Sequence, residues 1–319
     1  MREAVLGLDT SNYRTSLALV TPEGEILLNE RRLLPVPAGE RGLRQSDAVF
    51  AHLRALVGME DSLRERAEVK IRAVAASVRP RDPEDSYMPV FQVGQTVGRT
   101  LAGTMGVPFF PTTHQRGHLA AAALGSSLDP ERPYLAIHLS GGTTDLLYLE
   151  GEKLIPLGGC LDLHAGQLVD RAGVAMGLSF PAGPELETLA EAGKSSGELS
   201  CSLEKGDLHC HLSGAESQVQ RWIREGRKDQ EDIAREIYDL LARTLARMLR
   251  AGAKKTGAEQ ALVTGGVAAS RLLRRLLTER MRKGPGGPEL VFGSPALSGD
   301  NAVGTALIGI RKMAEGDGE

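Results

Sequence analysis

The sequence predicts an α/β protein made of two halves with similar architecture. Two sets of short apolar runs, each separated by polar or glycine-containing turns, support this fold class. The first set lies at residues 4–9, 15–20 and 25–29. The second set begins at Tyr134 and lies at residues 134–139, 145–149 and 153–157. The order of strands and turns repeats although the amino-acid sequence does not, so we expect two subdomains, 1–130 and 131–319.

Helical and strand patterns follow each predicted three-stranded meander. In the first half we expect helices at 46–56 and 89–105, strands at 71–77 and 108–110, and a helix that begins near two histidines. In the second half we expect helices at 163–176, 184–193, 214–225, 228–253 and 267–281, and strands at 261–264 and 289–292. The polar stretch 194–213 is expected to form a hairpin of two short strands. A closing helix at 302–314 is expected to pack back on the first half.

The composition is that of an ordinary soluble globular protein. The chain has 319 residues, 41% hydrophobic and 25% charged, with a formal net charge of -3. This balance gives no overall attraction to nucleic acid or to a membrane, and no apolar window is long enough to span a bilayer. The N-terminus shows no cleavage pattern of a signal peptide. Three cysteines, Cys160, Cys201 and Cys210, do not suggest a disulfide framework, so we expect a reduced, cytoplasmic protein.

The segment from Thr112 to Ala123 contains two histidines, His114 and His118, four residues apart before an alanine-rich run. On a helix this spacing places both imidazoles on one face, where they can bind one metal ion. Gln115 stands where the metalloprotease motif H-E-x-x-H has its glutamate base, so protease chemistry is not expected. Such a pair also occurs as surface or capping histidines. Asp300 offers a third ligand, and two histidines with one carboxylate leave metal positions open for substrate.

Three segments rich in glycine and hydroxyl groups suit phosphate binding. Ser140-Gly141-Gly142-Thr143 lies between two predicted strands, and Asp9-Thr10-Ser11 occupies the matching turn of the first half. Gly265 and Gly266 end a strand and lead through Ser270 into a helix, whose N-terminus suits an anion or a flat adenosine. Each segment also reads as an ordinary turn. The pairing of two equivalent turns is typical of actin-like ATPases, which hold nucleotide phosphates between such turns.

Other polar residues give weaker signals. Asp170 falls on an otherwise apolar helix, and Gly183 lies in the rigid loop 181–184, where the backbone can approach a ligand. Each also reads as an ordinary helix face or turn. His209-Cys210-His211 with Cys201 suggests zinc, but alternate residues of a strand point to opposite faces, so these side chains do not converge.

Together these segments resemble the TsaD/Gcp family, also called Kae/Qri-type proteins. The similarity covers nearly the whole chain and keeps order and spacing. It is carried by GLDTSNYRTSLAL, THQRGHLAAA, LSGGTTDLLYL, DLHAGQLVDRAGVAMGLSFPAGPELE, LVTGGVAASRLLRR and SGDNAVGTAL. The resemblance implies an actin-like (ASKHA) fold with two RNase H-like subdomains around a cleft.

The same resemblance implies a threonylcarbamoyltransferase. The family moves this group from threonylcarbamoyl-adenylate to the adenosine next to the anticodon of tRNA. It implies one divalent metal, iron or zinc, on His114, His118 and Asp300. An adenine nucleotide (threonylcarbamoyl-adenylate, ATP or AMP) is expected against Ser140, Gly141, Gly142, Thr143, Asp170, Gly183 and Gly266 to Ser270. tRNA and subunits similar to TsaB or TsaE are the implied partners.

The chain departs from the family at several charged positions. Tyr13 and Arg14 replace an acidic pair, Thr143 replaces a histidine, Ser270 an asparagine and Glu216 a lysine. These changes suggest a divergent paralogue. Carbamoyl transfer to another acceptor, as in HypF and nodulation-type enzymes, is therefore one alternative, and a non-catalytic nucleotide-binding scaffold is another. A plain ATPase or sugar kinase fits less well, because those enzymes use acidic groups around Mg²⁺ and need no histidine pair.

Overall fold

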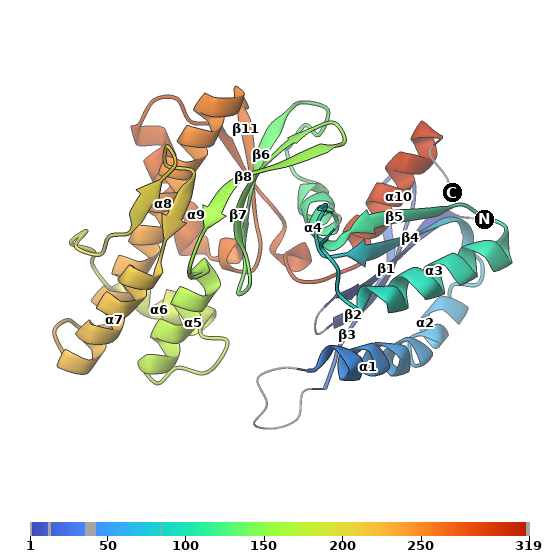
Figure 1. Cartoon of the computed structure of the whole chain (residues 1–319), viewed down its shortest axis with the longest axis horizontal. Coiled ribbons are helices and arrows are strands. Elements are labelled where there is room, and N and C mark those ends of the chain that lie inside the picture. Colours follow the sequence, from blue (N-terminus) through green and yellow to red (C-terminus); the bar gives the residue numbers. More distant parts are fainter. Residues whose placement is uncertain (1, 12–13, 36–42, 84, 317–319) are drawn as a thin grey trace. The chain divides into compact units, whose positions relative to one another are not determined.

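The computed structural model describes residues 2–11, 14–35, 43–83 and 85–316. The chain divides into two compact units (Figure 1). The first unit comprises Met1–Leu124 and Ala296–Glu319, and the second comprises Gly125–Pro295. The first break thus lies close to the expected boundary at residue 130. The segment from Ala296 onward belongs to the first unit, whereas the expected boundary at residue 130 places it in the second subdomain.

The first unit is a five-stranded sheet covered by helices on both faces. Its strands are β1 (Glu3–Ser11), β2 (Arg14–Val20), β3 (Ile26–Leu33), β4 (Lys70–Arg79) and β5 (Phe109–Thr113). They are ordered β3-β2-β1-β4-β5. The first three strands form the expected antiparallel meander, and β4 and β5 extend it in parallel. Its helices are α1 (Gln45–Val57), α2 (Glu60–Arg64), α3 (Phe91–Met105), α4 (His114–Ala123) and α10 (Val303–Glu315).

Strand β1 is apolar on both faces because a helix covers each side of the sheet. Leu6 and Leu8 belong to the core that contains Ala102 of α3, whereas Val5 belongs to the core that contains Ala306 of α10. A Cβ atom at Gly7 would lie 2.3 Å from the carbonyl oxygen of Ala302, so only glycine allows α10 to lie this close. The closing helix α10 thus packs on the sheet of the first unit.

The second unit contains a seven-stranded sheet ordered β12-β11-β6-β7-β8-β10-β9. Its strands are β6 (Tyr134–Leu139), β7 (Thr144–Glu150), β8 (Lys153–Cys160), β9 (Ser202–Glu204), β10 (His209–His211), β11 (Gln260–Thr264) and β12 (Glu289–Phe292). Its helices are α5 (Ala165–Ala175), α6 (Gly183–Ala192), α7 (Ser213–Glu225), α8 (Gln230–Thr256) and α9 (Arg271–Lys283). A 3-10 turn, η1 (Val267–Ala269), precedes α9, and a second, η2 (Pro295–Leu297), follows β12. The second meander, β6-β7-β8, is antiparallel as expected.

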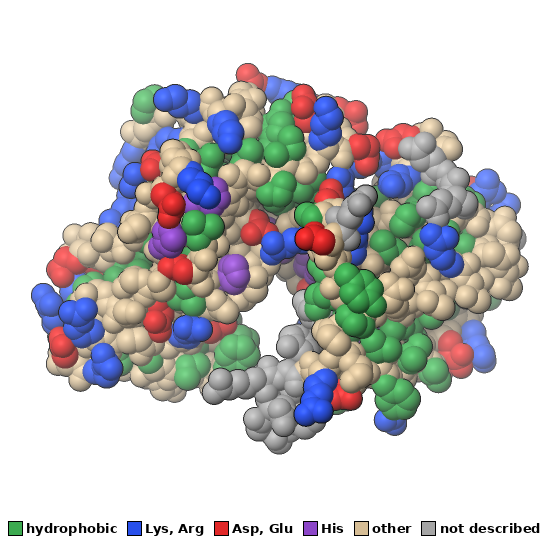
Figure 2. Space-filling model, in the orientation of Figure 1, with side chains coloured by type: hydrophobic (Ala, Val, Ile, Leu, Met, Phe, Trp, Pro, Cys, Tyr) green, Lys and Arg blue, Asp and Glu red, His purple; other side chains and the backbone are tan. Residues whose placement is uncertain are grey.

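The long helix α8 provides much of the core of the second unit. Its apolar face buries Ile237, Leu241 and Leu245 against the sheet and the neighbouring helices. Figure 2 shows side chains of both charge signs interspersed over the visible face, as the small net charge suggests. Within the described residues, no helix combines the length and hydrophobicity needed to cross a membrane.

Candidate metal centre and nucleotide pocket

Helix α4 begins at the first histidine of the predicted pair. The side chain of Thr113 accepts a hydrogen bond from the backbone N–H of Arg116 and so caps the helix. The adjacent loop is fixed by Asp82, which accepts hydrogen bonds from Thr113 and from the guanidinium of Arg116. His114 and His118 therefore lie one turn apart on a helix whose start is firmly held, with 3.0 Å between their Nε2 atoms.

Asp300 reaches the histidines because α10 packs closely on α4. A Cβ atom at Gly304 would lie 1.7 Å from the carbonyl oxygen of Gly117, so the two helices touch through backbone. Asn301 holds the turn before α10 by donating to the carbonyls of Leu297 and Gly299. The Oδ1 atom of Asp300 lies 3.6 Å from Nε2 of His114 and 3.3 Å from Nε2 of His118.

Asp9 at the end of β1 forms a further contact behind the first histidine. Its Oδ2 atom lies 2.9 Å from Nδ1 of His114. Burial alone would raise the pKa of Asp9, but the charge and hydrogen bond of His114 outweigh it and hold the pKa well below its usual range. Burial likewise disfavours the imidazolium of His114, yet Asp9 and Asp300 raise its pKa to about 9. The two carboxylates thus create a negative field around the ring.

The donor set fits a divalent metal ion. Ligand atoms of His114, His118 and Asp300 all lie within 4.8 Å of one another, and within the described chain no other group of three or more potential ligands meets this condition. A tetrahedral site with metal–nitrogen bonds of about 2.1 Å has ligand–ligand distances of about 3.4 Å, close to the three separations given above. A histidine ligand commonly donates its other N–H to a carboxylate, as Nδ1 of His114 can to Asp9. Burial raises the pKa of Asp300, but His118 and His114 outweigh it and lower this pKa, which favours the ionised ligand.

The first predicted phosphate turn makes contacts within the first unit. Asp9, Thr10 and Ser11 are buried, and Asp9 faces His114. The hydroxyl of Thr10 donates to the carbonyl of Val90 and accepts from the N–H of Gly94. The side chains of Asp9 and Thr10 thus join β1 to the segments that carry His114, Val90 and Gly94, and phosphate binding by this turn stays a prediction. The hydroxyl of Ser11 is also buried, with no hydrogen-bond partner among the described residues.

A pocket of about 450 Å³ lies within the second unit. Seven of the predicted nucleotide residues line it: Gly141, Asp170, Gly183, and Gly266, Val267, Ala269 and Ser270 from the stretch Gly266 to Ser270. Six residues outside the predicted set also line it: Gly166, Val169, Pro181, Pro184, Glu187 and Tyr238. Glycine backbone, apolar side chains and a few polar groups are the usual lining of a nucleotide pocket.

The polar groups of this pocket are held by named contacts. Asp170 accepts the backbone N–H of Ala182 at 2.9 Å, and burial raises the pKa of this carboxyl. The hydroxyl of Tyr238 donates to the carbonyl of Gly183, and burial raises its pKa well above the usual value. Glu187 accepts the N–H of Leu272 in the first turn of α9. These bonds fix the pocket walls at α5, α6 and α9.

In the second unit, Ser140, Gly142, Thr143 and Gly265 belong to the predicted nucleotide residues but do not line this pocket. Ser140 and Thr143 close the turn through a backbone hydrogen bond of 2.8 Å, and the Ser140 hydroxyl accepts the N–H of Gly142. Gly265 has φ of +103°, and a Cβ atom there would lie 2.2 Å from the carbonyl oxygen of Leu139. These residues shape the backbone beside Gly141 and Gly266 rather than the pocket wall.

The departures from the family motif lie in different places. Tyr13 lies outside the described residues. A Cβ atom at Gly299 would lie 3.3 Å from Nη1 of Arg14, so this guanidinium is close to the residue before Asp300. The hydroxyl of Ser270 caps α9 by accepting the N–H of Leu273. In the His209-Cys210-His211 strand, His211 pairs with Glu204 and Asp162 while Cys210 is buried, as the alternation predicts.

Comparisons with known proteins agree with the motifs. The model of the TsaD family, described as tRNA N6-adenosine threonylcarbamoyltransferase, matches residues 42–307. Among solved structures, full-length HypF in a phosphate- and nucleotide-bound form has a TM-score of 0.64 at 13% identity, covering 99% of this chain and 47% of that one. HypF of T. kodakarensis has a TM-score of 0.63 at 14% identity, covering 98% and 48%.

A ROK hexokinase from Thermus thermophilus has a TM-score of 0.56 at 16% identity, with 98% of this chain and 99% of that one covered. The chain spans about half the length of the two HypF chains. At these identities the structural likeness concerns the fold, and it confirms the expected actin-like architecture. Because the family model matches most of its length, this chain belongs to the TsaD family of tRNA N6-adenosine threonylcarbamoyltransferases.

Proposed function

We propose that this protein is a metal-dependent transferase that moves a threonylcarbamoyl group from threonylcarbamoyl-adenylate to a tRNA adenosine. The observation that carries the proposal is the cluster of His114, His118 and Asp300, with Asp9 behind His114. Family membership supports the class of reaction. A scaffold subunit would need neither the three converging ligands nor a buried carboxylate that orients one of them.

Each residue of the cluster has a distinct role in this proposal. His114, His118 and Asp300 would hold an iron or zinc ion, which supplies a Lewis acid that polarises the carbamoyl carbonyl. With a metal ion in place of the Nε2 proton, Asp9 would accept the remaining ring proton of His114 at Nδ1 and so orient Nε2 toward the cluster. Asp9 and Asp300 also provide the negative charge that favours a divalent cation over water.

The pocket of the second unit would take the adenosine part of the donor. Its volume of about 450 Å³ suits a nucleoside, and Gly141, Gly183 and Gly266 let backbone approach the ligand. During transfer, a bond forms between the acceptor amine and the carbamoyl carbon, and the bond from that carbon to the adenylate oxygen breaks. The amine proton passes to solvent and adenylate leaves.

Metal analysis and a transfer assay on matched variants test the proposal. Wild type, His114→Ala and Asp300→Ala are compared with His209→Ala and Asp229→Ala, which lie in the second unit outside the nucleotide pocket. Iron or zinc should be near stoichiometric in wild type and controls, and lost in the two cluster variants together with transfer of labelled threonylcarbamoyl to an ANN-reading tRNA. Wild-type protein that transfers the group without bound metal would contradict the proposal.

A second candidate is carbamoyl transfer to an anionic small acceptor. It is favoured by Arg14, whose guanidinium lies beside Gly299, next to the ligand Asp300. A cation there attracts a carboxylate or phosphate. If this candidate holds, wild type transfers the group to a carboxylate-bearing amine or alcohol in preference to tRNA, and Arg14→Gln weakens that activity. Equal small-molecule transfer by wild type and Arg14→Gln would contradict this second candidate.

A further inference from the structure

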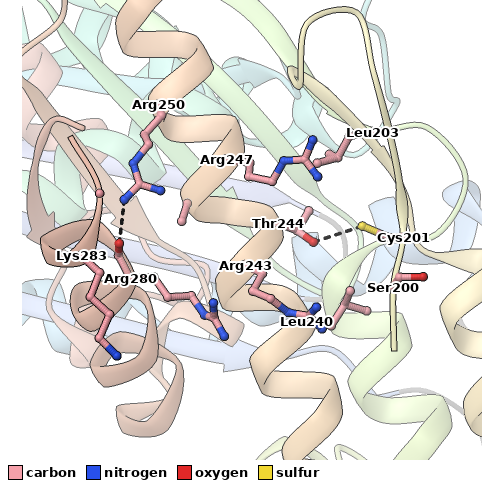
Figure 3. A pocket seen from close by; sticks show the side chains of 12 residues that line it. Ser200, Cys201, Leu203, Leu240, Arg243, Thr244, Arg247, Arg250, Arg280 and Lys283 are labelled. Atoms are coloured by element: carbon pink, nitrogen blue, oxygen red, sulfur yellow. Dashed lines mark hydrogen bonds between the residues drawn. The ribbon is translucent and has the colours of Figure 1, made fainter. Parts of the chain in front are cut away.

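A second cavity of the second unit, of about 380 Å³, is lined by five cationic side chains. We call it the arginine pocket. Arg243, Arg247 and Arg250 project from α8, and Arg280 and Lys283 from the end of α9 (Figure 3). No carboxylate occurs among its lining residues in the described chain. The arginine pocket shares no lining residue with the nucleotide pocket.

The arrangement follows from the sequence of α8. Positions 243, 247 and 250 recur at four- and three-residue intervals, so their side chains form one stripe on the helix. The opposite face of α8 is buried in the core. The last turn of α9 adds Arg280, Arg282 and Lys283, of which Arg280 and Lys283 line the cavity. Two helices thus bring five positive charges to one cavity.

Nearby acids neutralise only part of this charge. Asp239 is paired with Arg243 and Arg280, and the exposed Asp207 is paired with Arg247. Within the described residues, Arg250 and Lys283 have no ion-pair partner. Five cations facing two carboxylates leave an excess of three positive charges around the cavity.

Some of these cations also stabilise the fold. Nη2 of Arg250 donates to the carbonyl of Arg280 at 2.6 Å and so caps the C-terminus of α9 (Figure 3). Nη2 of Arg243 donates to the carbonyl of Leu199 at 2.6 Å. These bonds occupy part of each guanidinium. The buried Nε atoms of Arg250 and Arg280 find no acceptor in the described structure, so both groups retain unused donors. Helix capping by one arginine does not explain a cluster of five cations.

We propose that the arginine pocket binds phosphate groups. Guanidinium groups present planar pairs of N–H donors that match phosphate oxygens, and four of the five cations are arginines. The phosphates come either from the backbone of an RNA or from a free polyphosphate. The RNA source rests on the proposed function, because tRNA is the acceptor there. Phosphate binding itself rests on the pocket alone.

The test uses the full-length protein and two probes, inorganic tripolyphosphate and an unmodified tRNA transcript. The pocket variant is Arg247→Gln with Lys283→Gln, both exposed side chains whose loss spares the bonds of Arg243, Arg250 and Arg280. The matched control is Arg224→Gln with Arg282→Gln, which removes the same charge from exposed positions of the same unit outside the pocket. Circular dichroism and thermal melting verify that both variants are folded.

We expect the pocket variant to bind tripolyphosphate at least about tenfold more weakly than wild type, and the control to bind it as wild type does. If RNA is the source, tRNA binding also weakens, and the slope of log K against log salt falls by about 1.5 to 2. If free polyphosphate is the source, tRNA binding does not change. Equal binding of both probes by the pocket variant and the control overturns the proposal.

Failure of the proposed function is separable from failure of this inference. His114→Ala lies in the first unit and should abolish transfer while it leaves tripolyphosphate binding unchanged. If His114→Ala retains transfer, the metal mechanism fails. If the pocket variant retains full phosphate binding, the arginine pocket has only a structural role.

Discussion

The two units open with the same three-stranded meander, but their first strands end differently. In the first unit, Asp9, Thr10 and Ser11 at the end of β1 are 1%, 0% and 0% exposed. In the second unit, Gly141 and Gly142 after β6 are exposed, and no atom lies within 4 Å of a Cβ built on either. One strand end holds the His114 side chain, whereas the other remains accessible.

This difference shows that equivalent positions of a repeated architecture need not share a function. The side chains cause this difference. At the first strand end they are a carboxylate and hydroxyls that point into the unit, whereas the glycines at the second strand end leave the backbone exposed. The first strand end should therefore control metal affinity and stability, and the second should control nucleotide affinity. Four predictions test this division.

The largest expected effect is on metal affinity when Asp9 is replaced. Asp9→Ala removes the acceptor for Nδ1 of His114 and one of two negative charges at the cluster. We expect metal affinity to fall roughly 10- to 100-fold, as for other such partners of metal ligands. Titration against a chromophoric chelator measures this. Asp47→Ala, at an exposed site on α1, is the control, and an unchanged affinity in Asp9→Ala would remove the orienting role.

The second prediction concerns the accessible turn. A Cβ atom at Gly166 would lie 2.6 Å from the carbonyl oxygen of Ser140, so Gly166→Ala must displace this turn. We expect nucleotide affinity to fall by about tenfold, with metal affinity unchanged because the metal cluster belongs to the first unit and shares no residue with the pocket of the second. Calorimetry with an adenylate analogue provides the measurement. Gly214→Ala, outside the pocket at a position where a Cβ meets nothing within 4 Å, should bind as wild type does.

A smaller effect is expected for the buried hydroxyl of Thr10. Thr10→Val loses the bond to the carbonyl of Val90 and leaves the N–H of Gly94 without its acceptor. The free energy of unfolding should fall by about 1–2 kcal/mol, measured by urea denaturation. Thr100→Val, on an exposed face of α3, is the matched control and should cost less. If Thr10→Val instead lost nucleotide binding without losing stability, Thr10 would act as a phosphate ligand.

The effect that is smallest at neutral pH concerns His52, which is buried beside Thr15 in the first unit. Burial lowers the pKa of His52 to about 4, although Asp9 opposes the shift. Because the unfolded chain binds this proton with a pKa near 6.5, stability is complete above about pH 6.5 and is lost as the pH falls toward 4. His52→Gln should flatten the decline in melting temperature between pH 7 and 5. An equally steep decline would show that other groups cause it.

Much of the fold can be predicted from the sequence because apolar periodicity and turn residues are local signals. The two meanders and the helices around α8 lie close to their expected ranges. The short helix α2 carries no buried residue, so its sequence has no apolar stripe that would predict a helix. The histidine pair is a local signal as well, whereas no local pattern joins Asp300 to it: the residues offer Asp300 only as a candidate ligand, and the resemblance implies its place in the set.

The role of Asp9 could not be predicted in the same way. Asp9 and His114 are separated by 105 positions in the chain, and a carboxylate at a strand end reads equally well as a turn residue. Tyr238 and Glu187 present a similar difficulty, because each lies on a helix whose pattern predicts only packing. The stripe of Arg243, Arg247 and Arg250 is visible in the sequence, but a charged stripe normally indicates a solvated face.

The first unit contains both ends of the described chain, with residues 125–295 between its two parts. On the ribosome, the second unit is therefore synthesised in full before the last strand-covering helix of the first unit emerges. Since domains generally fold as units during synthesis, the second unit should fold first. Asp300 leaves the ribosome only after the whole second unit, so a chain terminated before it would carry a folded second unit but not all three residues of the proposed metal cluster. Metal loading would then distinguish chains that contain α10 from chains terminated before it.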